Sequence, residues 1–181
     1  LSGHMHIEGL FQPGAGNVWR PVLTRPRDQW LDFSERTSFA IHLKADLFIS
    51  IHTGGSFGSE AGGITVFYFE TQTDLKPPDT KHPSRNLWGR IHAHHREKSK
   101  LLAEFIQRQL SDRIQFTETR VRGTQIVAAE GADMPAVLIE AGCLTHPVQG
   151  KKLQDPEVLS DIAKAISMGI NDFFSNMDLH K

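Results

Sequence analysis

The sequence predicts an α/β domain built on a largely parallel sheet. Short runs rich in Ile, Val, Leu and Phe recur along the chain, with the length and composition of strands that are buried on both faces. Stretches with a helical period and marked helix starts alternate with these runs. In addition, two of the runs end in a polar residue that is soon followed by glycine, as at the carboxyl end of a strand in an open α/β sheet.

The first part of the predicted domain is a strand followed by a capped helix. Residues 21–24, PVLT, are a strand candidate, and turn residues separate them from the helix. Asp32 and Glu35, three residues apart, form a capping-box pattern, so we expect a helix that begins there and runs to about Lys44. The inner positions expected for this helix are Phe33, Phe39, Ala40 and Leu43.

The central strand is expected within residues 45–52, ADLFISIH, where the apolar run ends at His52. Residues 56–63 are rich in glycine and serine and predict a loop beside the end of this strand. A second strand at 64–69, ITVFYF, is indicated by its β-branched and aromatic residues. Prolines between 71 and 85 then predict another loop.

The second half of the chain predicts two helices and a further buried strand with a polar end. That strand lies within 134–142, MPAVLIEAG, where Glu140 follows the apolar run. The last helix is expected to begin after Asp155, its cap, with Pro156 in the first turn. The other expected elements are a helix at 86–110, a weak strand at 114–122, a short apolar piece at 126–129 that fits another strand, and a loop at 144–147.

The composition is that of an ordinary globular domain, and it excludes several classes of protein. The 181 residues suit a single domain spanning 1–181, and the formal charge of −1 creates no whole-molecule field for nucleic acid or anionic lipid. The one cysteine, Cys143, excludes an internal disulfide. No apolar run approaches the length of a membrane span. No leader pattern occurs, so we expect any signal peptide to lie outside these residues.

His52 and Glu140 are the main candidate site residues, because each comes at the end of a buried strand, where ligands bind in such sheets. An imidazole at this position can titrate near neutral pH or hold a metal. Placing a carboxylate directly after apolar strand residues costs folding free energy unless the charge is paired with a cation or serves the chemistry of a site. Glu140 is therefore either a proton-transfer group or one partner of an ion pair at the strand end.

Residues 1–20 are atypical and allow two interpretations. His4, His6 and Glu8 would share one face of an extended segment, which would make a metal-binding face. Alternatively, the segment is rearranged or partly foreign, since GHM and HIEG look like cloning or protease-site remnants. The turn residues of PGAG, at 13–16, predict a loop.

Several motifs, taken in order, resemble a known family. Together they are similar to the zinc-dependent N-acetylmuramoyl-L-alanine amidases, peptidoglycan hydrolases also called amidase type 3. The order and spacing agree from about Pro21 to Phe174, which is most of the chain. The motifs are VLTR (22–25), the pair Glu35–Arg36, ADLFISIH (45–52), GITVFYF (63–69) and PAVLIEAGCLTHP (135–147).

The resemblance implies a three-layer fold, a mixed and mostly parallel sheet with helices on both faces. It also implies Zn²⁺ as cofactor, and hydrolysis of the amide between N-acetylmuramic acid and L-alanine of the peptidoglycan stem peptide. By match to the family motifs, His52 is a metal ligand and Glu140 the catalytic glutamate. His4, in LSGH, is the best match to the first ligand, and Glu8 is the acidic candidate for the remaining one.

Departures from the family pattern fall mainly in the first segment. LSGH lacks the Asp-Pro of the family's DPGH motif, and Glu8 lies before PGAG instead of after it. Too few residues separate Gly16 from Val22 for the helix that the family places there, since a helix needs roughly ten residues or more. In the last motif, His146 stands where the family usually has Asn, and Cys143 where it usually has Phe.

The expected partner is peptidoglycan, a glycan strand with its stem peptide, in the periplasm or outside the cell. An activator protein or a wall-binding domain outside this chain would fit as well. Two alternatives stay open: another amidohydrolase on a similar sheet, such as a zinc carboxypeptidase, and a metal-free relative that binds wall fragments or regulates a partner.

Overall fold

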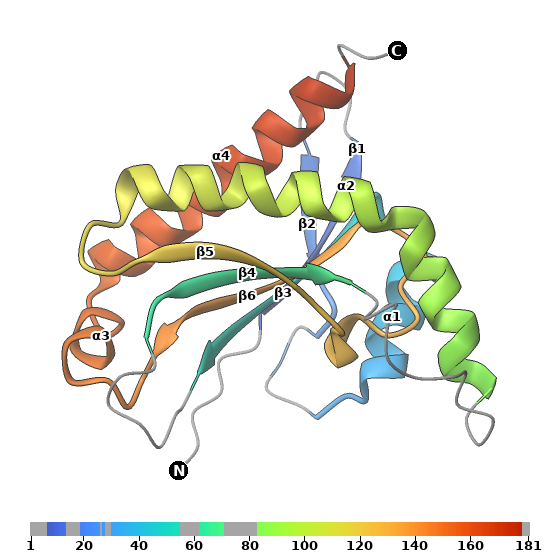
Figure 1. Ribbon diagram of the computed structural model, residues 1–181, viewed down its shortest axis with the longest axis horizontal. Helices are drawn as coiled ribbons and strands as arrows, with labels where there is room; N and C mark the ends of the chain where they lie inside the picture. Colours follow the sequence, from blue (N-terminus) through green and yellow to red (C-terminus); the bar gives the residue numbers. More distant parts are fainter. Residues whose placement is uncertain are drawn as a thin grey trace.

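A computed structural model describes residues 7–13, 19–25, 27, 30–54, 62–70 and 83–178, and these form one sheet with helices on both faces (Figure 1). The sheet has six strands in the order β2-β1-β3-β6-β4-β5. The strands are β1 (Ile7–Pro13), β2 (Trp19–Leu23), β3 (Leu47–Gly54), β4 (Ile64–Phe69), β5 (Thr119–Thr124) and β6 (Ala136–Cys143). The predicted α/β class and the mixed sheet are confirmed.

Fewer of the strand pairs are parallel than we expected. Strand β3 is parallel to β6, and β4 is parallel to β5, whereas the pairs β1–β2, β1–β3 and β4–β6 are antiparallel. A parallel pair needs a crossover of a dozen or more residues, usually a helix. The link from Gly54 to Ile64 is shorter than that, so β4 returns in the opposite direction to β3. The expectation of a mostly parallel sheet is corrected to an even mixture of directions.

The helices are α1 (Phe33–His42), α2 (Pro83–Arg113), α3 (Pro147–Lys152) and α4 (Pro156–Asp178), with a 3₁₀ turn η1 (Val127–Ala129). The capping box of α1 is present, and the Asp32 amide donates to Glu35 Oε2 at 2.8 Å. The cap of α4 is also present, because the Glu157 amide donates to Asp155 Oδ1 at 2.9 Å. Neither long helix, α2 nor α4, is apolar enough along its described length to cross a bilayer.

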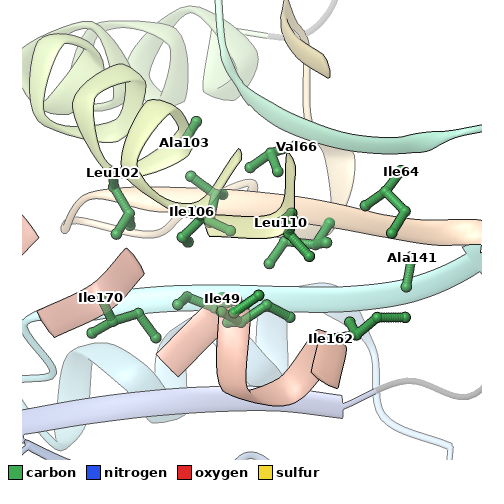
Figure 2. Packing of buried hydrophobic residues seen from close by; sticks show 14 of the residues in the cluster. Ile49, Ile64, Val66, Leu102, Ala103, Ile106, Leu110, Ala141, Ile162 and Ile170 are labelled. Atoms are coloured by element: carbon green, nitrogen blue, oxygen red, sulfur yellow. The ribbon is translucent and has the colours of Figure 1, made fainter. Parts of the chain in front are cut away.

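The first face of the sheet packs against α2 and α4 and forms the larger apolar cluster (Figure 2). Ile49 and Ile139 from the sheet contact this layer, and Ile106 of α2 is fully buried within it. The two helices approach closely at Gly169, where an added Cβ would lie 2.5 Å from Ile106 Cα. Burial of this one face accounts for most of the described core.

The second face carries a smaller cluster around α1 and η1. Thr37 of α1 donates its hydroxyl to the Glu130 carbonyl at 3.1 Å and thereby links α1 to the end of η1. Two expectations are wrong here. The piece at 126–129 forms a 3₁₀ turn instead of a strand, and Phe39 is 37% exposed instead of inward. The buried members are Ala40, Ala45, Phe48, Ile126, Ala128, Ala129, Ala132, Met134 and Ala136.

Candidate functional site

Four polar residues lie side by side across the sheet, one on each of four neighbouring strands. His52 of β3 is in register with Glu140 of β6, Glu140 with Thr65 of β4, and Thr65 with Arg120 of β5. Residues in register on adjacent strands point to the same face, and the strands are about 4.8 Å apart. We call His52, Glu140, Thr65 and Arg120 the polar row.

The polar row lies on the second face, near the carboxyl ends of β3 and β6. Ile51 and Ile139, the neighbours of His52 and Glu140 in sequence, pack on the first face, so alternation places the row on the other side. The second cluster, as described, includes no residue of β3 beyond Phe48 and none of β6 beyond Leu138. In Figure 1 the arrowheads of β3 and β6 point towards α3, whereas α1 and η1 lie at the other end of the sheet.

His52 is held by its neighbour two residues before it. The Ser50 hydroxyl and His52 Nε2 are 2.8 Å apart, and Ser50 is fully buried. This hydrogen bond restrains the orientation of the imidazole ring, as partners of metal-binding histidines commonly do. The register between β3 and β6 shifts directly after His52, and such irregularities are frequent beside active sites.

Glu140 is exposed, although both of its neighbours in β6 are buried. Its carboxylate forms no ion pair with the residues that the structure describes, so the alternative of an ion pair at the strand end has no support among them. Thr65, the next member of the polar row, is 8% exposed. A carboxylate that is accessible and not neutralised by a cation is available for proton transfer.

A buried amide fixes the chain just beyond Glu140. Gln149 of α3 is 4% exposed; its Oε1 accepts from the Cys143 amide at 3.0 Å, and its Nε2 donates to Thr117 Oγ1 at 3.0 Å. Gly142, near the end of β6, has a φ of +133° that residues with a side chain rarely adopt. Gln149 therefore ties the end of β6 to the segment that leads into β5, a role that the sequence did not reveal.

His146 acts as a helix cap. Its Nδ1 accepts from the amides of Val148 at 3.2 Å and Gln149 at 3.3 Å, at the start of α3. The expected loop at 144–147 is therefore shorter than predicted, because α3 begins at Pro147. Asn, the residue that the resemblance places here, is also a good N-cap, so the substitution preserves the function of the position.

The side chains of the other two predicted metal ligands, His4 and Glu8, are outside the described part of the structure. His4 lies outside the described residues. Glu8 belongs to β1, where its backbone is in register with Ser50, but its side chain lies outside the description. Among the described side chains, no group of three His, Cys, Asp or Glu could hold a metal ion. A separate polar pair, His95 Nε2 of α2 and Asp133 Oδ1, lies 3.0 Å apart before the amino end of β6 and so away from the polar row.

Comparison with known proteins agrees with this fold and identifies the family. The family model of N-acetylmuramoyl-L-alanine amidases matches residues 14–172, which is most of the chain and includes the whole polar row. The chain belongs to the N-acetylmuramoyl-L-alanine amidase family. This confirms the resemblance that the sequence motifs indicated.

Relatives of this amidase-family chain occur in Bacillus. A cell wall amidase of Bacillus anthracis is 31% identical over 174 residues, which cover 94% of this chain and 30% of that protein. The N-acetylmuramoyl-L-alanine amidase LytC of Bacillus subtilis is 27% identical, over 85% of this chain and 27% of LytC. The chain spans about a third of the length of these two relatives or less.

Solved amidase domains share the fold. The amidase AmiC2 of Nostoc punctiforme has a TM-score of 0.64 at 22% identity, and the match covers 85% of this chain and 72% of that one. The CwlD amidase of Clostridioides difficile, solved in complex with the GerS lipoprotein, has a TM-score of 0.62 at 25% identity, with coverages of 85% and 75%.

Proposed function

We propose that this protein hydrolyses the amide bond between N-acetylmuramic acid and L-alanine of the peptidoglycan stem peptide, with zinc as cofactor. The observation that carries the proposal is the register of His52 with Glu140 on parallel neighbouring strands, in a chain of the amidase family. An imidazole and a carboxylate side by side at strand ends are the parts that a hydrolytic site needs.

The residues present fit a zinc site in part. His52 offers an imidazole whose ring is restrained by Ser50, which suits a metal ligand. His4 and Glu8 are the proposed remaining ligands, and the backbone register of Glu8 with Ser50 supports its inclusion. When bound, zinc would lower the pKa of a water to about 7 and polarise the scissile carbonyl.

Glu140 is the proposed general base. Its carboxylate would accept a proton from the attacking water and return that proton to the leaving amine of L-alanine. Its exposure and its lack of an ion pair with the described residues support this role, since a neutralised carboxylate would be a weaker base. Thr65, in register with Glu140 on β4, would limit the space available to a substrate on that side of the carboxylate.

The experiment that tests the proposal is digestion of purified peptidoglycan with analysis of the new amino termini. We expect L-alanine amino termini and about one zinc per chain. A different amino-terminal residue would favour another amidohydrolase, and a chain purified without zinc that cleaves nothing would favour the metal-free binder.

Two variants separate the roles within the site. His52→Ala should lose zinc and activity, whereas Glu140→Gln should keep zinc and lose about 10²- to 10⁴-fold in kcat, the usual contribution of general acid–base catalysis. Glu104→Gln, the same carboxylate-to-carboxamide change at an exposed position of α2, is the matched control and should retain activity. Wild-type activity in Glu140→Gln would remove the general-base assignment.

The proposed location is the periplasm or the exterior of the cell, where peptidoglycan is found. A protein activator is a further proposed partner, supported by the CwlD amidase, which was solved in complex with a lipoprotein. Pull-down with the full-length protein would identify such a partner.

A further inference from the structure

Strand β5, at the edge of the sheet on the Glu140 side, carries two arginines on the same face. Val121 packs on the first face, so Arg120 and Arg122, on either side of it, lie on the second. Arg120 is in register with Thr65, and Arg122 is in register with Phe67, a half-buried residue that packs against the second cluster. The basic edge of the sheet therefore borders the same face as Glu140.

The two arginines differ in what they contact. Arg120 Nη2 donates to the Gly62 carbonyl and to Glu118 Oε2, each at 3.3 Å, so Arg120 holds the start of β4 in place. Arg122 is exposed and forms no ion pair or hydrogen bond with the residues that the structure describes. Of these two arginines, Arg122 is therefore the one whose guanidinium is available to a ligand.

We propose that Arg122 is a specificity-determining residue that binds a free carboxylate on the peptide portion of the substrate. This inference rests on the proposed function, because it takes the scissile amide to lie beside Glu140. Arginine suits the task, since its planar fork can bind a carboxylate through two parallel hydrogen bonds.

The spacing across the sheet fits a peptide that runs from Glu140 towards the β5 edge. Two gaps between strands and two residues along β5 separate the backbones of Glu140 and Arg122, which amounts to about 12 Å. An extended peptide advances about 3.3–3.6 Å per residue, so this gap equals roughly three residues. Phe67, beside Arg122 on the intervening strand β4, would offer an apolar surface to the peptide's side chains.

Local recognition is distinguishable from general attraction to an anionic wall. The chain has a formal charge of −1, so its overall field does not draw in an anionic polymer. A specific contact at Arg122 should respond to one carboxylate at one position of the peptide. Removing a different exposed arginine should leave that response unchanged.

The test measures binding in the Glu140→Gln background, where turnover is expected to be about 10²- to 10⁴-fold slower. Two synthetic muramyl stem peptides are compared by calorimetry, one with a free carboxylate at the third residue and one with a carboxamide there. We expect about a tenfold tighter Kd for the carboxylate form, the effect of one charge-assisted hydrogen-bonded contact. Arg122→Gln should abolish this preference, and Arg122→Lys should restore part of it.

Arg108→Gln is the matched control, because Arg108 is an exposed arginine of α2 on the other side of the sheet. It should keep the tenfold preference. Equal loss in Arg108→Gln and Arg122→Gln, a preference that persists in Arg122→Gln, or no preference in the parent protein would overturn the inference.

Kinetics provide a second readout. On cleavable peptidoglycan, Arg122→Gln should raise KM for substrates with the free carboxylate and leave kcat unchanged, as expected for a contact made equally in the ground and transition states. Absence of any L-alanine amino termini with the unmodified enzyme would refute the proposed function instead, and the binding comparison would still decide the role of Arg122.

Discussion

The two faces of the sheet differ in how they are used, although the same strands supply both. The first face packs against α2 and α4 across β3, β6, β4 and β5, and the strand residues in that cluster are apolar. The second face is apolar only towards the amino ends of β3 and β6, where α1 and η1 pack. Towards the carboxyl ends it carries the polar row.

This difference shows how one sheet separates stability from chemistry. Alternation along a strand places consecutive residues on opposite faces. Ile139 therefore packs in the core of the first face, whereas its neighbour Glu140 is exposed on the second face. Because the first face supplies most of the buried area, the second face can leave a carboxylate exposed without a large cost in folding free energy.

The largest expected effect is a loss of stability when Ile139, the buried neighbour of Glu140, is truncated. Ile139→Ala should lower the free energy of unfolding by about 2–5 kcal/mol, because it opens a cavity at a fully buried position. The folded fraction should retain the activity of the parent protein. Urea unfolding and kcat per folded molecule measure the two consequences separately.

Glu140→Gln is the reciprocal control for this prediction. It should leave the free energy of unfolding within about 0.5 kcal/mol of the parent, as surface changes usually do. A large loss of stability in Glu140→Gln, or a large loss of activity per folded molecule in Ile139→Ala, would contradict the separation of the two faces.

A smaller effect is expected at the crossing of the two covering helices. Gly169→Ala would place a Cβ 2.5 Å from Ile106 Cα and 2.8 Å from its amide nitrogen, and backbone atoms cannot move aside easily. We expect a loss of about 1–3 kcal/mol from overpacking, in spite of the better helix propensity of alanine. Thermal unfolding would measure it.

Met168→Ala, one residue earlier on the same helix, is the comparison variant, because Met168 is 37% exposed. It should cost clearly less than Gly169→Ala. If both changes had the same effect, the close approach of α2 and α4 would not be a determinant of the packing on the first face.

The smallest expected effect concerns Asp46, the residue before β3. Burial raises the pKa of its carboxyl above the usual value of 3.8, and Oδ2 makes no hydrogen bond with the described residues. The neutral form is therefore favoured in the folded state, and that stabilisation is lost as the pH rises through the raised pKa. Asp46→Asn should be slightly more stable than the parent at pH 7.

The advantage of Asp46→Asn should shrink as the pH falls below 3.8, where the carboxyl is protonated in both the folded and the unfolded state. Melting temperatures at neutral and acid pH would show the trend. Asp112→Asn, an exposed change at the end of α2, should show no comparable dependence. A constant difference at all pH values would exclude burial of the charge as the cause.

Much of the fold could be predicted from local signals. The apolar runs gave β3, β4 and β6, and the capping residues Asp32 and Asp155 marked the starts of α1 and α4, because both kinds of signal act over a few residues. The direction of β4 depends on a short connection and tertiary pairing, so the composition of the strand could not reveal it. Helix α3 was missed because histidine is an unusual cap.

The candidate site was only partly predictable. His52 and Glu140 were identifiable because each follows an apolar run, and the structure places them in register. Thr65, Arg120 and Arg122 come from strands whose register is fixed by packing, which no local pattern encodes. Gln149 was likewise hidden, since its partners Cys143 and Thr117 meet it only in three dimensions.

Because β4 runs antiparallel to β3, the connection between these two strands begins and ends at the same edge of the sheet. Gly54 closes β3 and Gly62 precedes β4 at the same rim of the sheet, so both ends of this connection lie on the side of the polar row. Doubling the length of such a closed stretch costs only about 0.6 kcal/mol of entropy. An insertion between Gly54 and Gly62 is therefore expected to change the surroundings of the polar row at little cost in stability, while the sheet stays the same.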